Sequence, residues 1–193
     1  LSIIFVPEGL VHANLNRDVH TLSHYNFPTP LGLESKVDFW KKIYSEYSTD
    51  HFIVHDKKNL NIIYEVVYIK NSSKLSNRVK EQKLGKVKKK YIKLLKKIAR
   101  SKNPLSLNND AKRVFHLVGA NFKKASRQIR VQVGQKNRFR KGLENSGMFN
   151  SKINKIIKNA KLPMELGVIP HVESSFQINA YSSAGAAGIW QFT

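Results

Sequence analysis

Apolar residues recur at every third or fourth position along much of the chain, which is the spacing of helices with one buried face. The first such stretch begins at about Ser35, and a second, rich in lysine, runs from 72 to about 102. Two shorter helices are expected near 110–118 and 121–133. The pattern therefore predicts a mainly α-helical protein.

One stretch departs from the helical pattern. Residues 51–69 are rich in β-branched and aromatic side chains on both sides of a polar run, Asp56 to Asn59, which predicts a small β-hairpin. A hairpin alone is marginally stable, so we expect helices to pack on it. The predicted organisation is a mostly helical N-terminal region over 34–150, with the hairpin near 51–69, and a separate region from 151 to 193.

The second region begins with another predicted helix, which Ser151 is placed to cap. One side of this helix is apolar and is expected to face inward, while its lysines face water. The inward-facing residues are Ile153, Ile156, Ile157 and Ala160.

A glutamate interrupts the apolar side of the helical stretch that follows. From Leu162 to Phe176 the core positions fall at spacings of four and three, and Glu173 occupies one of them. Burial disfavours an ionised carboxylate, so an unpaired Glu173 should keep its proton nearer neutral pH and act as a general acid. A partly buried glutamate that bonds neighbouring backbone is the alternative. His171 should point away from Glu173 on a helix.

The chain is strongly basic, with 34 Lys and Arg against 13 Asp and Glu and a net charge of +21. That excess indicates a polyanionic partner: nucleic acid, an anionic cell-envelope surface or an acidic wall polymer. The lysine-rich helix over 72–102 could form a binding module for such a partner, or only a solvated face. Its single aromatic residue is Tyr91 and it has no base-reading motif, so no specific nucleic acid is expected.

The start of the sequence resembles the end of a secretory signal peptide. An apolar run leads to Val11-His12-Ala13, with small residues three apart before a polar stretch. Residues 1–13 would then be the end of the signal peptide and 14–33 an extended lead-in, and the protein would lie in the periplasm or cell envelope. A buried N-terminal strand is the alternative. The lack of Cys suits either a reducing cytosol or a Gram-negative periplasm.

Two pairs of histidines have a spacing that can hold a metal on a helix, His20 with His24 and His51 with His55. The second pair lies on a predicted strand, where residues four apart are about 13 Å apart. The first has no glutamate motif near it. We therefore expect no metal site and no cofactor.

The last 32 residues, LPMELGVIPHVESSFQINAYSSAGAAGIWQFT, resemble the opening of the catalytic domain of lytic murein transglycosylases, and most closely the membrane-bound type D branch. The family pattern contains Leu-Pro-x-x-Leu, then Pro-x-x-Glu-Ser-x-Phe, then Ala-x-Ser-x-x-Gly-Ala-x-Gly, an aliphatic residue, Met or Trp, and Gln. This chain matches it at Leu162, Pro163, Leu166, Pro170, Glu173, Ser174, Phe176, Ala180, Ser182, Gly185, Ala186, Gly188, Ile189, Trp190 and Gln191.

The resemblance implies a lysozyme-like helical domain that starts at 151. It implies that Glu173 is the catalytic acid/base, which cleaves the bond between N-acetylmuramic acid and N-acetylglucosamine in murein and leaves 1,6-anhydro ends. The pattern continues past Thr193 in the family, so we expect this chain to be a truncated, monomeric and poorly active form of such an enzyme. The residues that the resemblance places at the substrate are Ser174, Ser182, Gly185, Gly188, Trp190 and Gln191.

Overall fold

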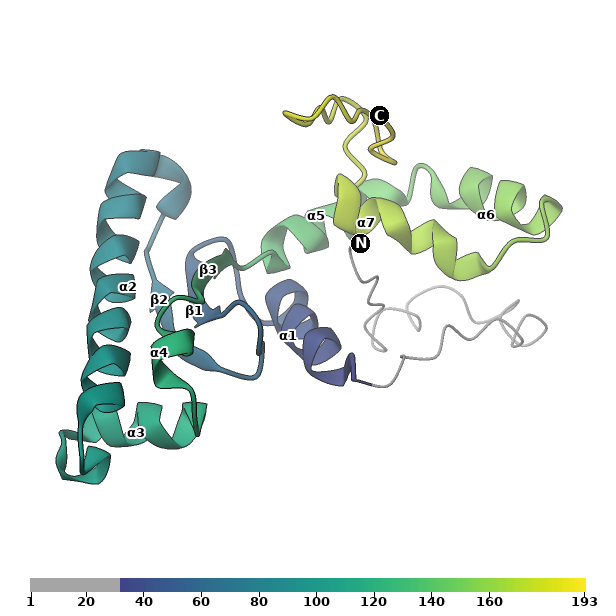
Figure 1. Ribbon diagram of the computed structural model, residues 1–193. Helices are drawn as coiled ribbons and strands as arrows, with labels where there is room; N and C mark the ends of the chain where they lie inside the picture. Colours follow the sequence, from purple (N-terminus) through teal and green to yellow (C-terminus); the bar gives the residue numbers. More distant parts are fainter. Residues whose placement is uncertain (1–31) are drawn as a thin grey trace. The chain divides into compact units, whose positions relative to one another are not determined.

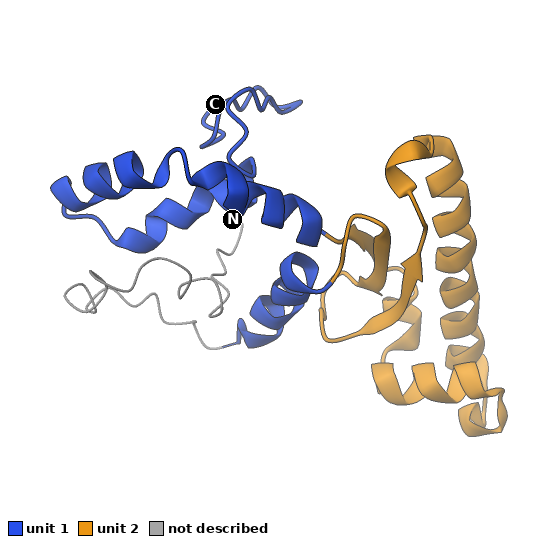
Figure 2. Ribbon diagram, turned by 180° about the vertical axis from the view of Figure 1, so that it is seen from behind, with its two compact units in different colours: residues 1–46, 135–193 blue, residues 47–134 orange. Residues whose placement is uncertain are grey.

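The computed structural model describes residues 32–193, which form two compact units (Figures 1 and 2). Unit 1 combines the described residues up to Glu46 with Gln135–Thr193, and unit 2 is Tyr47–Gly134. Helices predominate and there is one three-stranded sheet, so the predicted mainly helical class is confirmed. The expectations for 1–13 and for nearly all of 14–33 lie outside the described residues. Within 32–193, no helix is both long and apolar enough to cross a membrane.

The sheet of unit 2 is antiparallel throughout. β1 (His51–Asp56) lies in its centre, between β2 (Ile63–Tyr68) and β3 (Ile129–Val133). The pairing of β1 with β2 confirms the hairpin predicted near 51–69. Since β1 has a partner on both edges and helices nearby, its residues from Phe52 to Asp56 are all buried.

The helix predicted over 121–133 is wrong beyond its first turn. α4 (Phe122–Ala125) is a single turn, and β3 follows it. Ile129, Val131 and Val133 alternate with polar residues, which is the period of a strand. The open edge of β1 offers hydrogen-bond partners to this segment, so strand pairing satisfies its backbone groups better than an isolated short helix would.

α2 (Asn77–Arg100) is the long helix of unit 2 and packs against α3 (Asn109–Val118), α4 and β3. It begins at Asn77 because the Ser76 hydroxyl accepts a hydrogen bond from the backbone of its first turn. A 3-10 turn, η3 (Ser72–Lys74), precedes it, and another, η4 (Pro104–Ser106), follows. The buried core between these elements contains Val54, Ile62, Tyr64, Tyr91, Leu95, Ile98, Ala111, Val114, Ala125 and Ile129.

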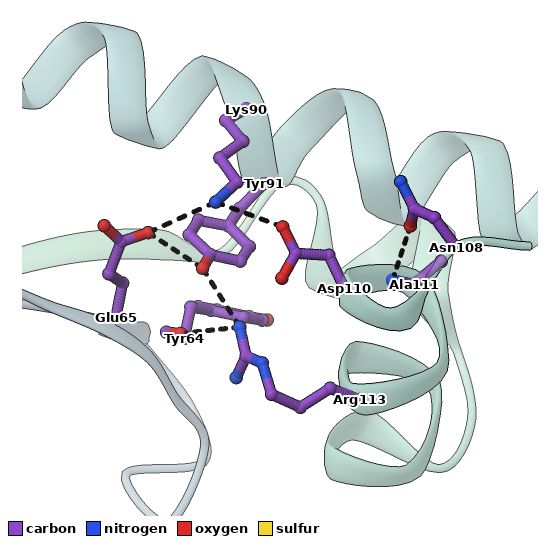
Figure 3. A network of polar contacts seen from close by, with 8 residues as sticks. All are labelled: Tyr64, Glu65, Lys90, Tyr91, Asn108, Asp110, Ala111 and Arg113. Carbon is purple, nitrogen blue, oxygen red and sulfur yellow. Dashed lines mark hydrogen bonds and ion pairs between the residues drawn. The ribbon is translucent and has the colours of Figure 1, made fainter.

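A polar network joins β2, α2 and α3 beside this core (Figure 3). The Tyr91 hydroxyl donates to Glu65 Oε2 at 2.8 Å and accepts from the Arg113 guanidinium at 3.0 Å. Arg113 also donates to a backbone carbonyl of β2. Lys90 lies 3.2 Å from Asp110 and 3.6 Å from Glu65. Glu65 and Asp110 therefore neutralise Lys90 locally.

Unit 1 brings together two segments that are far apart in the sequence. α1 (Glu34–Ser45) contacts α5 (Lys136–Ser146), and the Gln135 N–H donates to the Ile43 carbonyl at 2.8 Å. The rings of Tyr44 and Phe139 lie 5.5 Å apart between centroids. These contacts fix α1 beside the segment that leads into the C-terminal residues.

α6 (Asn150–Asn159) buries less of its surface than the sequence predicted. Ile153 and Ile157 are buried, as expected. Ile156 is 66% exposed and Ala160 is also exposed, so these two assignments are wrong. The main packing partner of the helix is the 3-10 helix that follows it, and Ile153 and Ile157 share a small core with Phe176, so a narrow side suffices for contact.

The segment after α6 is not one continuous helix. Instead η5 (Met164–Val168) is a 3-10 helix, and α7 (Ile169–Glu173) is a short α-helix. Pro170 lies in the first turn of α7, where its missing N–H costs no hydrogen bond. The predicted cap of α6 is also wrong, because the N-cap is Phe149 and Ser151 lies within the helix.

Candidate active site

Glu173 is the last residue of α7 and its side chain is exposed, so the predicted core position is wrong. The prediction assumed a constant helical period from Leu162 onward. The backbone instead changes from 3-10 to α geometry at Ile169, and it turns at Ser175 and Phe176, where φ is 54° and 56°. The turn buries Phe176 and leaves Glu173 at the surface. The burial expected for Glu173 is therefore not found.

An open cavity of about 480 Å³ lies beside Glu173 in unit 1. Ser174 and Ser175 line it from the same turn, and residues of α1 and α5 also line it. Glu173 is the only carboxylate among the lining residues, and Arg138 is the only permanent cation. The remaining lining residues are Tyr44, Gln135, Phe139, His171, Val172, Gln177 and Ala180.

Tyr44 reaches this cavity from α1, and the sequence motif around Glu173 did not point to it. Burial raises the pKa of its hydroxyl, and the negative charge of Glu173 raises that pKa further. The phenol therefore stays protonated at neutral pH and can donate a hydrogen bond in the cavity. Arg138, on α5, was likewise not predicted as a site residue.

His171 also lines the cavity, although the sequence suggested that it points away from Glu173. Its ring packs on Phe176 at 4.6 Å and on Phe139 at 5.5 Å between centroids. Its Nδ1 atom is buried and has no hydrogen-bond partner within residues 32–193. Burial lowers the pKa of His171 to about 4, because the imidazolium form would lose its hydration, so the ring is neutral at pH 7.

Ser174 and Ser182, both predicted site residues, have structural hydrogen bonds. The Ser174 hydroxyl is buried and donates to the Ile189 carbonyl at 2.8 Å, which joins α7 to the glycine-rich loop. The Ser182 hydroxyl accepts hydrogen bonds from the backbone N–H groups of Ala184 and Ala186, at 3.3 and 3.0 Å. Only Ser174 of this pair lines the cavity.

The other predicted substrate residues lie in a loop over 180–192 and do not line the cavity. Gly185 and Gly188 have φ of 88° and 71°, a conformation that favours glycine. The Gln191 amide donates to the backbone oxygen of Gly188 at 2.9 Å and to that of Ala180 at 3.3 Å. Trp190 packs against the small core around Phe176. The loop is thus a self-bonded turn, anchored to α7 by Ser174.

Within the described residues, no group of three or more His, Cys, Asp or Glu side chains is placed to hold a metal ion. His51 Nδ1 lies 2.8 Å from the Ser48 hydroxyl, and His55 Nδ1 lies 2.9 Å from the Asp56 carbonyl. The pair on β1 is therefore occupied by local hydrogen bonds, and His20 and His24 lie outside the described residues.

In the comparison with known proteins, residues 151–193 have a match. The chain has no significant match among curated proteins or among solved structures. A family model does match its C-terminal residues, and the match contains α6, α7, Glu173 and the glycine-rich loop. Residues 151–193 are similar to the transglycosylase SLT domain.

Proposed function

We propose that this protein is a lytic transglycosylase of peptidoglycan. It would cleave the β-1,4 bond between N-acetylmuramic acid and N-acetylglucosamine and leave 1,6-anhydromuramic ends. The observation that carries the proposal is the SLT-domain match over 151–193, in which Glu173 stands exposed at an open cavity.

Glu173 would act first as an acid and then as a base. Its carboxyl group protonates the glycosidic oxygen as the bond to the muramic C1 breaks. The resulting carboxylate then takes the proton of the muramic 6-hydroxyl while that oxygen bonds to C1, which closes the anhydro ring and restores the acid. A two-carboxylate glycosidase needs a second acid at about 5 to 9.5 Å. The cavity lining holds no second carboxylate, which supports a single-residue mechanism.

The other groups would bind and orient the sugar. The protonated Tyr44 hydroxyl can donate to a substrate oxygen near Glu173, and neutral His171 gives the cavity an uncharged aromatic side. Ser174 would hold the loop whose backbone and side chains meet the acetamido groups. We place Ser182, Gly185, Gly188, Trp190 and Gln191 in that loop as substrate-binding residues.

The proposal includes a location and a set of partners. Peptidoglycan glycan strands are the substrate, and the protein acts as a monomer in the periplasm or cell envelope without a cofactor. The absence of Cys from the sequence is compatible with that compartment. A single acid/base residue with an intramolecular nucleophile requires no metal.

The test is the product of a long incubation with purified peptidoglycan, analysed by mass spectrometry for 1,6-anhydro ends. The full chain should release such ends slowly, as expected for a poorly active form, and Glu173→Gln should abolish their release because the amide cannot donate or accept the proton. Glu165→Gln, on η5 and outside the cavity lining, is the matched control and should behave as wild type. Equal yields from wild type and Glu173→Gln would remove the assignment.

A further inference from the structure

The basic charge of the protein is concentrated in unit 2. Residues Tyr47–Gly134 contain 22 Lys and Arg against 5 Asp and Glu, a net charge of +17 out of +21 for the chain. All residues outside unit 2 therefore account for only +4. The charge excess that indicates an anionic partner thus lies outside the unit that contains Glu173.

Much of this charge is ordered along one side of α2. Six exposed basic side chains recur at helical spacing on the side of α2 opposite the buried Tyr91, Leu95 and Ile98. We call these six side chains the cationic stripe. With a rise of about 1.5 Å per residue, the stripe is about 21 Å long. Its members are Lys86, Lys89, Lys93, Lys96, Lys97 and Arg100.

The cationic stripe lacks acidic partners. Between Gln82 and Arg100 the helix carries no Asp or Glu, and across residues 32–193 none of the six stripe side chains forms an ion pair. Lys90, on the edge that faces β2 and α3, is paired with both Glu65 and Asp110. The structure thus neutralises the lysine next to its own fold and leaves the stripe available to an external anion.

The C-terminal half of the stripe is also concave. Lys93, Lys96, Lys97 and Arg100 line a cavity of about 500 Å³, together with Ser101 and Leu107 from the connection to α3. Four cations around one open cavity can neutralise several anionic groups at once. A second element, beyond the helix face itself, therefore shapes the surface for a ligand.

Between Lys86 and Arg100, the cationic stripe has no exposed aromatic or large apolar side chains beside its charges. Tyr91 is the only aromatic residue of α2 and it is 1% exposed, so the helix has no platform on which bases could stack. Val79, at 36%, is the only large apolar side chain of α2 that is exposed, so no apolar wedge accompanies the stripe for insertion into lipid. These features favour a hydrated polymer with repeated anionic groups over nucleic-acid bases or a bilayer interior.

We propose that the cationic stripe binds the carboxylates of peptidoglycan stem peptides and holds the polymer on unit 2. The choice of peptidoglycan as the polymer rests on the proposed function. The inference of an anion-binding surface rests on the stripe itself and is independent of that function. Lysine ammonium groups act as separate point charges, which suits carboxylates spread along a flexible polymer. Binding should be multivalent. It should weaken steeply as the salt concentration rises, because the release of counterions on binding is then less favourable.

The experiment is co-sedimentation of the full chain with insoluble purified peptidoglycan at about 50 and about 300 mM NaCl. Both the reference protein and the variants carry Glu173→Gln, so the polymer stays intact whether or not the protein is an enzyme. The stripe variant replaces all six stripe residues with Gln. The control, with equal net charge, replaces six exposed lysines elsewhere in unit 2: Lys57, Lys58, Lys70, Lys74, Lys123 and Lys124.

At low salt the stripe variant should bind at least about tenfold more weakly than the control variant, with a flatter salt dependence. Circular dichroism should show both variants folded, since every replaced side chain is exposed. If the stripe variant and the control variant lose binding to the same extent, only the net charge of unit 2 matters and the inference is overturned. So would undiminished binding to peptidoglycan with amidated carboxylates, or tighter binding to duplex DNA or anionic vesicles. If the wild-type chain releases no anhydro products in the incubation described above, while binding here still depends on the stripe, only the proposed function is refuted.

Discussion

The Ser174 hydroxyl donates a 2.8 Å hydrogen bond to the carbonyl oxygen of Ile189, and Ser174 directly follows Glu173. The bond ties the glycine-rich loop to the end of α7. Both partners are at least half-buried, so water replaces the bond poorly if it is lost. The residue next to the proposed acid is therefore the attachment point of the loop proposed to bind sugar.

Ser174→Ala should release the loop over 180–192. The Ile189 carbonyl would lose its donor, and we expect a loss of about 1 to 3 kcal/mol in the free energy of unfolding. Limited proteolysis should cut the loop faster, and the yield of anhydro ends should fall. The exposed Ser183→Ala is the control. Unchanged proteolysis of Ser174→Ala would show that the loop is held by other contacts.

Tyr44→Phe should lower the yield of anhydro ends by about tenfold or more while leaving the fold intact, because it removes a hydroxyl donor from the cavity beside Glu173. The yield is measured by mass spectrometry as for Glu173→Gln. Tyr68→Phe changes a ring on β2 that is 59% exposed and outside both the cavity lining and the 180–192 loop, and should have little effect. Equal yields from the two variants would exclude Tyr44 from the site.

His171 should make the protein less stable in mild acid. Its pKa is lowered to about 4 in the folded state from 6.5, so the unfolded chain binds the proton more tightly. The contribution of His171 to stability is complete above pH 6.5 and is lost as the pH falls toward 4, by up to about 3 kcal/mol.

Urea unfolding at several pH values tests this with His171→Phe, which keeps an aromatic ring against Phe139 and Phe176. The variant should lose less stability than wild type between pH 6.5 and 4. His55, whose pKa burial also lowers, is present in both proteins and cancels in the comparison. His116→Phe, at an exposed position, is the control. Parallel pH profiles for wild type and His171→Phe would contradict the assignment.

Gly134→Ala should destabilise unit 2 strongly. A Cβ at this position would collide with the backbone oxygens of Tyr47 and Ser48, which cannot rotate away as a side chain can. We expect a loss of more than about 2 kcal/mol in urea unfolding. Gly85→Ala, in open space on α2, should instead stabilise by up to about 1 kcal/mol. A neutral Gly134→Ala would mean that the backbone there relaxes freely.

Features set by local pattern were predictable from the sequence. The two hairpin strands are rich in β-branched residues on either side of a turn, and α3 has a regular apolar side. β3 was not predictable, because its partner β1 lies far earlier in the chain and the same residues could also form a helix. The alternation of Ile129, Val131 and Val133 is a local strand signal, but it spans only five residues and does not identify the distant partner.

In the candidate site, too, local features were predictable from the sequence and those that depend on distant contacts were not. The motif around Glu173 is local and was recognised, whereas the exposure of Glu173 depends on a change of helix type at Ile169 that spacing alone does not reveal. Tyr44 and Arg138 enter the cavity because α1 packs on α5, a contact between distant segments. Such contacts depend on tertiary packing, which no single-segment pattern encodes.

The hydrogen bond from Gln135 to Ile43 has a consequence for how such a protein can diversify. It closes unit 1 on itself at the point where the chain departs for unit 2, and Gly134 packs against Tyr47 where the chain returns. Unit 2 therefore has the connectivity of a cassette, with entry and exit side by side. Its deletion, with a short linker from Glu46 to Gln135, would leave the framework around Glu173 covalently continuous, so the proposed polymer binding and the proposed catalysis can evolve on separate modules of one chain.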